Sequence, residues 1–357
     1  MKILYLIPDF KVGGVTTVVQ SIVEGMRMRG YDSKIICLKK LESGDFENLE
    51  MNSKFDLIKA LLRFKKIVSE YEPDVIHSHT IFSHFLALLY KVLFNKNIRV
   101  VNTEHGSLVD SQKNKLIFKV YKFLAKYANK ITFVSDFSAK TYIENNIVLK
   151  DMVEVIYNGI DSQENIINKN NIIKLKEGFK FCYIGRFSQE KNVILLIKAF
   201  EKLKIKSPDS DMSLYLVGDG EEDSFLRNYC NNNNLKNIYF LGFRRDIVEI
   251  LNSIDCLTLS SLTEGLPMVV LEAYANKVLA ISTDCGGVKE IIIDMNFIAK
   301  NNDLDSLLET MEYIFYLDKQ SKERKKLENY KYYKEKFSSN IMLQAYESLY
   351  KGVLKDI

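Results

Sequence analysis

The sequence predicts an α/β fold made of two doubly wound, Rossmann-like halves. Short apolar runs typical of buried parallel strands alternate with helical segments along most of the chain. The alternation breaks over residues 162–177, where Asn, Lys and Ile follow one another without a core pattern. It starts again with a new strand at Phe179. A length of 357 residues suits two such domains, each able to bury its own core.

The first half begins as a βαβ unit, with a strand, a glycine turn at Lys11–Gly14 and a helix. The strands expected in this half are Lys2–Ile7, Ser33–Leu38, Asp74–His79, Arg99–His105, Lys130–Ser135 and Val153–Gly159. The helices expected between them are Val15–Arg29, Phe55–Tyr71, Phe82–Phe94, Lys113–Asn129 and Ser138–Asn145.

The second half repeats this scheme. Its expected strands are Phe179–Gly185, Met212–Gly218, Asn237–Gly242, Asp255–Ser261, Val278–Thr283 and a short one near Phe297. Its expected helices are Val193–Lys204, one from Glu222, Asp246–Ser253, one beginning at Pro267, one after Gly287, Asp303–Phe315 and Asn340–Lys355.

Composition indicates an ordinary globular protein, because 47% hydrophobic and 27% charged residues exclude wholesale disorder. The five cysteines are scattered and form no CxxC pair, which favours buried thiols in a reducing cytosol. The opening MKILYLIPDF is too short for a signal peptide, and no apolar run is long enough to span a membrane. We therefore expect a cytoplasmic protein.

Positive charge is concentrated in the first half. Residues 1–150 hold 23 Lys+Arg against 15 Asp+Glu. Lysines recur along one predicted helix at spacings that place them on one face: Lys115, Lys119, Lys122, Lys126 and Lys130. Two interpretations stay open, a solvated helix face and a contact with an anionic membrane surface. The second would make the protein peripheral on the inner face of the cell membrane.

The stretch Glu264–Glu272 (EGLPMVVLE) follows an apolar strand and opens a helix. Pro267 suits the first helical position, so the amides from Gly265 to Val269 are left free to hold an anion. The carboxylates of Glu264 and Glu272 are better suited to accepting hydrogen bonds from sugar or ribose hydroxyls. A nucleotide sugar offers both kinds of group. The alternative is an amphipathic helix with two solvated glutamates.

Two other strand-to-helix turns carry residues suited to phosphate. Gly13 and Gly14 follow the first strand, where the missing Cβ atoms let a backbone approach a phosphate group. A plain tight turn is the alternative. Arg186 and Lys191 follow the first strand of the second half and provide two cations for a diphosphate leaving group. A local ion pair with Glu190 is the alternative. Neither turn is GxGxxG, which counts against a dinucleotide-dependent dehydrogenase.

All four histidines lie between His77 and His105. His77 and His79 point to the same side of one strand, and His105 ends the next. A zinc site is conceivable, but no other ligand lies at metal spacing. His105 is the best candidate for a functional histidine, whereas His77 and His84 fit structural roles. The DxD-like Asp209–Asp211 precedes a strand and is interpreted as a turn.

Taken in order, these segments resemble the retaining glycosyltransferases of family four. The resemblance rests on GGV near the N-terminus, TEHG (Thr103–Gly106), NGID (Asn158–Asp161), GRFSQEKN (Gly185–Asn192), VGDGE (Val217–Glu221) and EGLPMVVLEAYA (Glu264–Ala275). It implies a GT-B fold, with two Rossmann-like domains that face a cleft. The implied domains are 1–160 for the acceptor, 161–335 for the nucleotide sugar, and 336–357 as a helix that crosses back to the first domain.

The resemblance also implies roles for single residues. Arg186 and Lys191 would hold the donor diphosphate, with backbone contact from Gly13 and Gly14. Glu264 would meet the donor sugar together with the amides of Gly265, Leu266, Met268 and Val269. Glu272 would meet the ribose hydroxyls, and His105 would stand at the acceptor side. Thr16 and Thr17 depart from the commoner glycine-glycine-x-glutamate form, which weakens the assignment of Gly14.

The activity implied is metal-independent transfer of a sugar from a nucleotide-sugar donor, expected to be UDP-linked, to a glycan or lipid-linked acceptor in polysaccharide synthesis. No other cofactor is expected, and the modest net charge of +4 argues against nucleic acid as a partner. Two alternatives stay open at this point. One is a sugar-nucleotide epimerase of similar fold, and the other is a non-catalytic protein that binds sugar nucleotides.

Overall fold

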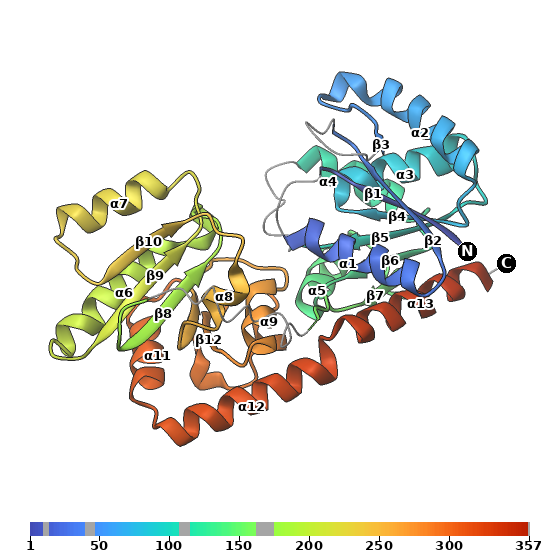
Figure 1. Cartoon of the computed structure of the whole chain (residues 1–357). Helices are drawn as coiled ribbons and strands as arrows, with labels where there is room; N and C mark the ends of the chain where they lie inside the picture. Colours follow the sequence, from blue (N-terminus) through green and yellow to red (C-terminus); the bar gives the residue numbers. More distant parts are fainter. Residues whose placement is uncertain (10–13, 40–46, 107–114, 162–174, 356–357) are drawn as a thin grey trace. The chain divides into compact units, whose positions relative to one another are not determined.

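The computed structural model describes residues 1–9, 14–39, 47–106, 115–161 and 175–355. The chain divides into two compact units (Figure 1). Unit 1 comprises Met1–Gly159 together with Ser339–Ile357, and unit 2 comprises Ile160–Ser338. Each unit is an α/β structure around one parallel sheet, and each is described by itself below.

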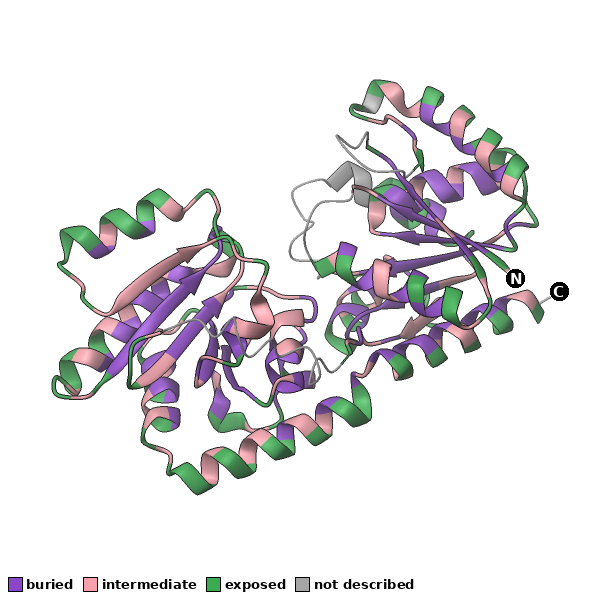
Figure 2. Cartoon of the chain, in the orientation of Figure 1, coloured by how far each residue is buried: buried purple, intermediate pink, exposed green. Residues whose placement is uncertain are grey.

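The sheet of unit 1 is parallel throughout its described strands, in the order β3-β2-β1-β4-β5-β6-β7. Their bounds are β1 Lys2–Ile7, β2 Asp32–Cys37, β3 Glu47–Asn48, β4 Val75–His79, β5 Arg99–Glu104, β6 Lys130–Phe133 and β7 Val153–Val155. β1, β4 and β5 are almost entirely buried (Figure 2). A parallel sheet covered on both faces explains why these strands are so apolar.

Helices cover this sheet in two layers. The helices are α1 Gly14–Met28, α2 Leu57–Tyr71, α3 Ile81–Leu93, α4 Lys115–Ala125, α5 Asp136–Glu144 and α13 Ser339–Lys355, with 3₁₀ turns η1 Lys54–Asp56 and η3 Lys150–Met152. α2, α3, α4 and α5 bury their apolar faces in one core against the sheet. α1 packs against β1 and β2 and also against α13. The final helix therefore completes unit 1.

α13 is attached to the sheet by buried polar groups. The Tyr350 hydroxyl lies 2.6 Å from His77 Nδ1, and the Tyr346 hydroxyl lies 3.1 Å from Thr103 Oγ1. His77 Nε2 lies 2.7 Å from the same Thr103 oxygen. At the surface, Glu347 accepts hydrogen bonds from Arg29 at 2.8 Å and Tyr31 at 2.7 Å. These contacts add directional hydrogen bonds to the apolar packing of α13.

Unit 2 holds a second parallel sheet, in the order β10-β9-β8-β11-β12-β13. The strands are β8 Phe179–Ile184, β9 Met212–Val217, β10 Ile238–Gly242, β11 Cys256–Leu259, β12 Leu279–Thr283 and β13 Ile298–Ala299. The helices are α6 Val193–Lys206, α7 Asp223–Asn232, α8 Ile247–Leu251, α9 Met268–Ala275, α10 Val288–Ile291, α11 Leu304–Tyr316 and α12 Lys319–Lys336, with 3₁₀ turns η5 Gln189–Lys191 and η6 Met295–Phe297. α6 packs on α11, and α9 packs on α12.

The structure departs from the sequence-based expectations at three places. The sequence pattern does not predict α12, because its 18 residues are mostly charged and only Asn329 and Tyr333 are buried. Its start is capped by Asp318, whose side chain accepts from the Ser321 amide. The two-residue strand β3 is too short to leave a pattern. Pro267 precedes the helix as its N-cap, since its ψ of 102° is extended.

The first prediction concerns the buried attachment of α13. Tyr350→Phe removes a hydroxyl and leaves His77 Nδ1 buried without its partner, so we expect the free energy of unfolding to fall by about 1–3 kcal/mol. Denaturant titration measures the change. The control is Tyr127→Phe, at a side chain that is 38% exposed, where we expect a change within about 0.5 kcal/mol. Equal losses in both variants would contradict the attachment.

Candidate functional site

The strand order of unit 2 brings two loops together. β8 and β11 are neighbours in the centre of the sheet, but the chain leaves β8 toward β9 and leaves β11 toward β12. Such a switch in direction opens a crevice at the carboxyl ends of the two strands. The loop Gly185–Asn192 follows β8, and residues 260–267 follow β11. Both loops hold residues for which the sequence predicts a function.

An ion pair joins the two loops. Lys191 Nζ lies 2.6 Å from Glu264 Oε1, and the two side chains keep 25% and 13% of their accessible surface. The Ser261 hydroxyl donates to the same carboxylate oxygen at 2.7 Å. The backbones are also linked, because the Leu262 amide donates to the Glu190 carbonyl at 2.7 Å. Ser260 Oγ donates to the Lys191 carbonyl at 3.1 Å. A predicted phosphate-binding cation and a predicted sugar-binding carboxylate thus lie in direct contact.

Gly286 lies in the loop that follows β12, and it packs against the loop that holds Glu264. Its φ is +58°, in the left-handed region. A Cβ at this position would overlap the carbonyl oxygen of Glu264. The neighbouring Gly287 amide donates to the Gly265 carbonyl at 3.1 Å. Glycine therefore allows the loop after β12 to approach the backbone of Glu264 closely.

Arg186 lies on the same loop as Lys191 and is exposed. The Tyr183 hydroxyl holds the loop by donating to the Arg186 carbonyl at 2.8 Å. The carboxylate that contacts Lys191 is Glu264, and not Glu190. Two cations on one short loop, one exposed and one half-buried, can bind a diphosphate.

α9 begins directly after this loop, with Pro267 as its N-cap. The first amides of a helix have no intrahelical partner, which leaves Met268 and Val269 able to donate to a ligand. Glu272 is partly buried one turn into the helix, and burial raises the pKa of its carboxyl. No described residue gives this carboxylate a hydrogen bond or an ion pair. An unpaired carboxylate in such a setting suits hydroxyl donors from a ligand.

The candidate residues of unit 1 lie after β1 and β5. Gly14 is exposed at the start of α1, and Gly13 lies outside the described residues. His105 follows β5 and is partly buried. Its Nε2 lies 2.9 Å from Nδ1 of the fully buried His79. Burial lowers the pKa of His105 to about 4, so the ring is neutral at physiological pH.

Metal binding has no support among the residues that the structure describes, where no cluster of His, Cys, Asp and Glu could hold an ion. His79 and His105 are hydrogen-bonded to each other. His77 and His84 are fully buried, in agreement with structural roles. Asp209–Asp211 lies in the turn before β9, at the opposite end of the strand from the candidate site.

The lysine-bearing segment differs in part from the prediction. α4 ends at Ala125, so Lys126 lies in the following turn and Lys130 begins β6. The side chain of Lys115 lies outside the described residues. Lys119, Lys122 and Lys126 are exposed, and so are Val120, Phe123 and Tyr127. The Lys126 ammonium lies 4.4 Å from the Phe123 ring centroid and 5.2 Å from that of Tyr127.

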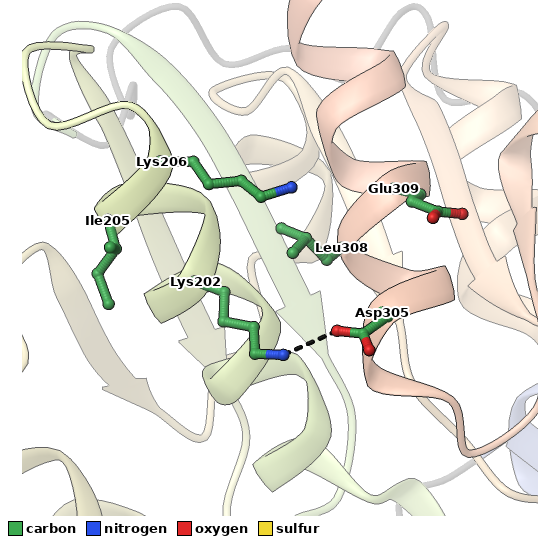
Figure 3. Close-up of a pocket in the computed structure, with 6 residues that line it drawn as sticks. All are labelled: Lys202, Ile205, Lys206, Asp305, Leu308 and Glu309. Carbon is green, nitrogen blue, oxygen red and sulfur yellow. Dashed lines mark hydrogen bonds and ion pairs between the residues drawn. The ribbon is translucent and has the colours of Figure 1, made fainter.

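A hollow elsewhere on unit 2 does not share this chemistry. It lies between α6 and α11 (Figure 3) and is lined by Lys202, Ile205, Lys206, Asp305, Leu308 and Glu309. Lys202 and Asp305 form a 2.7 Å ion pair across it, with 45% and 77% of their side-chain surfaces exposed. Such an exposed ion pair contributes little to the free energy of unfolding. None of the predicted site residues lines the hollow.

Three residues that shape these sites were not predicted in these roles: Ser261, Gly286 and His79. Ser261 stands three positions before Glu264, so its hydroxyl was within reach of the same loop. Gly286 and His79 act across neighbouring strands, and no local pattern indicates them.

The second prediction tests the support of the Glu264 loop. Gly286→Ala places a methyl group against the Glu264 backbone at a positive φ, so we expect a loss in unfolding free energy of at least about 3 kcal/mol. Gly242→Ala is the matched control, since Gly242 has a φ of +68° and open space where a Cβ would be added. It should lose only about 1 kcal/mol. Thermal and denaturant unfolding compare the two, and equal losses would rule out the clash.

Comparison with known proteins agrees with this geometry. Residues 163–335 match the family model "Glycosyl transferases group 1", and residues 12–164 match "Glycosyltransferase Family 4". An uncharacterized glycosyltransferase of Methanocaldococcus jannaschii is 30% identical over 92% of this chain and 91% of its own length. A second one from that organism is 31% identical over 67% of this chain, and the match spans 62% of that relative.

Two named proteins are also similar. The Escherichia coli "UDP-Gal:alpha-D-GlcNAc-diphosphoundecaprenol alpha-1,3-galactosyltransferase" is 29% identical over 71% of this chain and 69% of its own length. The crystal structure of HepE from Anabaena in complex with UDP has a TM-score of 0.82 at 18% identity, and covers 99% of this chain and 100% of that one. The two parallel α/β sheets are those of the GT-B fold. This chain belongs to glycosyltransferase family four.

Proposed function

We propose that this protein is a retaining hexosyltransferase that moves a sugar from a UDP-sugar to a hydroxyl of a glycan or lipid-linked acceptor in cell-surface polysaccharide synthesis. The observation that carries the proposal is the contact between Lys191 and Glu264 at the switch point of unit 2. In this contact Lys191, a cation suited to phosphate, is hydrogen-bonded to Glu264, a carboxylate suited to sugar hydroxyls. The name of the Escherichia coli relative and the UDP complex of HepE support the choice of donor and acceptor.

In this proposal, the donor binds to unit 2 by its two chemically different parts. Arg186 and Lys191 bind the diphosphate, and the amides of Gly265, Leu266, Met268 and Val269 add neutral donors. Glu264 accepts from hydroxyls of the transferred sugar. Glu272 accepts from the ribose hydroxyls, which provide the hydrogen-bond donors that its partly buried carboxylate otherwise lacks.

The proposed transfer retains the configuration of the anomeric carbon, because the acceptor attacks that carbon from the face on which the diphosphate leaves. The acceptor oxygen forms a bond to the anomeric carbon as the bond from that carbon to the β-phosphate oxygen breaks. The proton of the acceptor hydroxyl passes to the departing phosphate oxygen. Arg186 and Lys191 stabilise the negative charge that develops on the diphosphate. No protein nucleophile and no metal ion takes part in this proposal.

His105 of unit 1 has a separate role in the proposal. It lies at the carboxyl edge of the sheet, where Rossmann-like folds bind ligands. The imidazole is neutral, and Nδ1, the ring nitrogen that does not contact His79, can hydrogen-bond a sugar hydroxyl without adding charge. We place it beside the reacting sugar on the acceptor side. Gly13 and Gly14 would offer backbone contact to the diphosphate.

We also propose that unit 1 binds an anionic membrane surface, where a lipid-linked acceptor is found. Exposed lysines alternate with exposed Phe123 and Tyr127 on and after α4, and no acid interrupts residues 115–130. Aromatic rings suit the bilayer interface, and lysines suit anionic headgroups. None of the described helices is both long and apolar enough to cross a bilayer.

The third prediction tests the diphosphate cations. Lys191→Ala should lower kcat by about 100- to 1,000-fold with donor saturating, because one donor to the developing charge is lost. Lys202→Ala, which removes the exposed ion pair of Figure 3, should leave kcat unchanged. Product analysis with a panel of nucleotide sugars supplies the assay. Consumption of donor in proportion to acceptor identifies a transferase, and conversion without acceptor would instead identify an epimerase.

The fourth prediction concerns the membrane. Flotation with vesicles of phosphatidylcholine and phosphatidylglycerol at low salt should recover the protein with the lipid. Lys119→Glu, Lys122→Glu and Lys126→Glu together should weaken binding at least about 100-fold, at about 1 kcal/mol per lysine. In the control, Lys319, Lys331 and Lys334 on α12 are replaced by glutamate, which changes the net charge by the same amount as the test variant. The proposal that this face binds the membrane is excluded if the wild type does not float with the vesicles, or if both triple variants lose binding equally.

A further inference from the structure

His79 is the residue in contact with the proposed functional histidine. It is the last residue of β4, and its ring nitrogen Nδ1 lies 2.9 Å from Nε2 of His105, which follows β5. The two ring centroids are 5.2 Å apart. His79 is fully buried, whereas His105 is partly exposed. His79 therefore contacts a partly exposed side chain from a position that solvent does not reach.

The ring of His79 is itself held in place. His77 packs against it at a centroid distance of 4.2 Å, and Tyr5 stacks near it at 6.2 Å. Both nitrogens of His77 are engaged, one by Tyr350 of α13 and the other by Thr103 of β5. A rigid ring is thus presented to His105, with residues from β1, β4, β5 and α13 behind it.

The hydrogen bond has a direction that the surroundings decide. Burial lowers the pKa values of His79 and His105, so each ring carries one N–H at neutral pH. Nε2 of His79 is buried and has no hydrogen-bond partner among the described residues. A proton there would be an orphaned buried N–H, which proteins tolerate less readily than an unsatisfied acceptor. The proton of His79 is then on Nδ1 and points at His105.

We propose that His79 is a positioning residue, which donates its Nδ1–H to Nε2 of His105 and so fixes both the orientation and the Nδ1–H tautomer of that ring. His105 then has no free lone pair, and it meets the substrate as a hydrogen-bond donor. It serves to donate a hydrogen bond to an oxygen atom of the reacting sugar, and not to remove a proton. The inference rests on the proposed function for the role of His105 in transfer.

The fifth prediction has a spectroscopic part that needs no substrate. With ¹⁵N-labelled histidine, long-range ¹H–¹⁵N spectra distinguish protonated from unprotonated ring nitrogens, and the chain has only four histidines. In the wild type we expect His105 to be protonated on Nδ1. In His79→Leu, which removes the donor, we expect a mixture of both tautomers. His79→Asn, whose amide N–H can replace the lost donor, should restore the wild-type pattern.

The kinetic part follows the same variants. His79→Leu should lower kcat by about 10- to 100-fold, the range found when the partner that orients a functional histidine is removed. The KM for the sugar donor should stay within about twofold, since the side chains proposed to bind that donor belong to unit 2. His79→Asn should recover most of the lost kcat.

His84→Leu is the matched control. His84 is equally buried, has one hydrogen bond (to Ser78 Oγ at 3.0 Å) and also has one unpartnered ring nitrogen. We expect His84→Leu to lower thermal stability as much as His79→Leu does, but to leave kcat and the His105 spectrum unchanged.

The inference is overturned if wild-type His105 is protonated on Nε2, or if His79→Leu changes neither the His105 spectrum nor kcat. It is also overturned if His84→Leu lowers kcat as much as His79→Leu. The proposed role of His105 in transfer fails separately, if His105→Ala keeps full transfer activity. In that case the spectra still decide whether His79 orients His105.

Discussion

The contact between Lys191 and Glu264 is the interaction on which the architecture of unit 2 converges. Parallel strands can bring two loops to one edge of a sheet, but they do not by themselves fix the side chains. Here the ion pair, the Ser261 hydroxyl and the close approach of Gly286 together define one position for the Glu264 carboxylate. Its remaining oxygen lone pairs point away from these partners and are available to a ligand.

The same pair keeps the site electrically balanced before a donor arrives. A half-buried lysine without a counter-charge is costly, and a carboxylate alone would repel a diphosphate. In contact, each offsets the desolvation of the other. In the proposed donor complex, the diphosphate competes with Glu264 for Lys191, so the carboxylate becomes free to accept from sugar hydroxyls. Binding of the two parts of a nucleotide sugar would thereby be coupled through one side chain.

Most of the fold could be predicted from the sequence because both sheets are parallel and covered. Strands such as Lys2–Ile7 and Met212–Val217 are then almost wholly apolar, which makes them easy to recognise in the sequence. α12 could not be predicted in this way, since a helix held by few buried side chains has no amphipathic pattern. The residues of the candidate site also differ in how far they could be predicted. Glu264, Glu272, Arg186 and Lys191 follow strands and belong to local motifs, whereas Gly286 and His79 act through contacts between strands that no local pattern encodes.

The return of the chain to unit 1 has a consequence for the order in which the protein can be completed. Unit 2 is an insertion whose entry and exit are neighbours, because the Ile160 amide donates to the Phe337 carbonyl at 3.1 Å. Unit 2 can therefore close as soon as α12 has been synthesised. Unit 1 must wait for α13, since Tyr5 and His77 remain without Tyr350 until the last described helix emerges. On the ribosome, the unit that is started first is the one that is finished last.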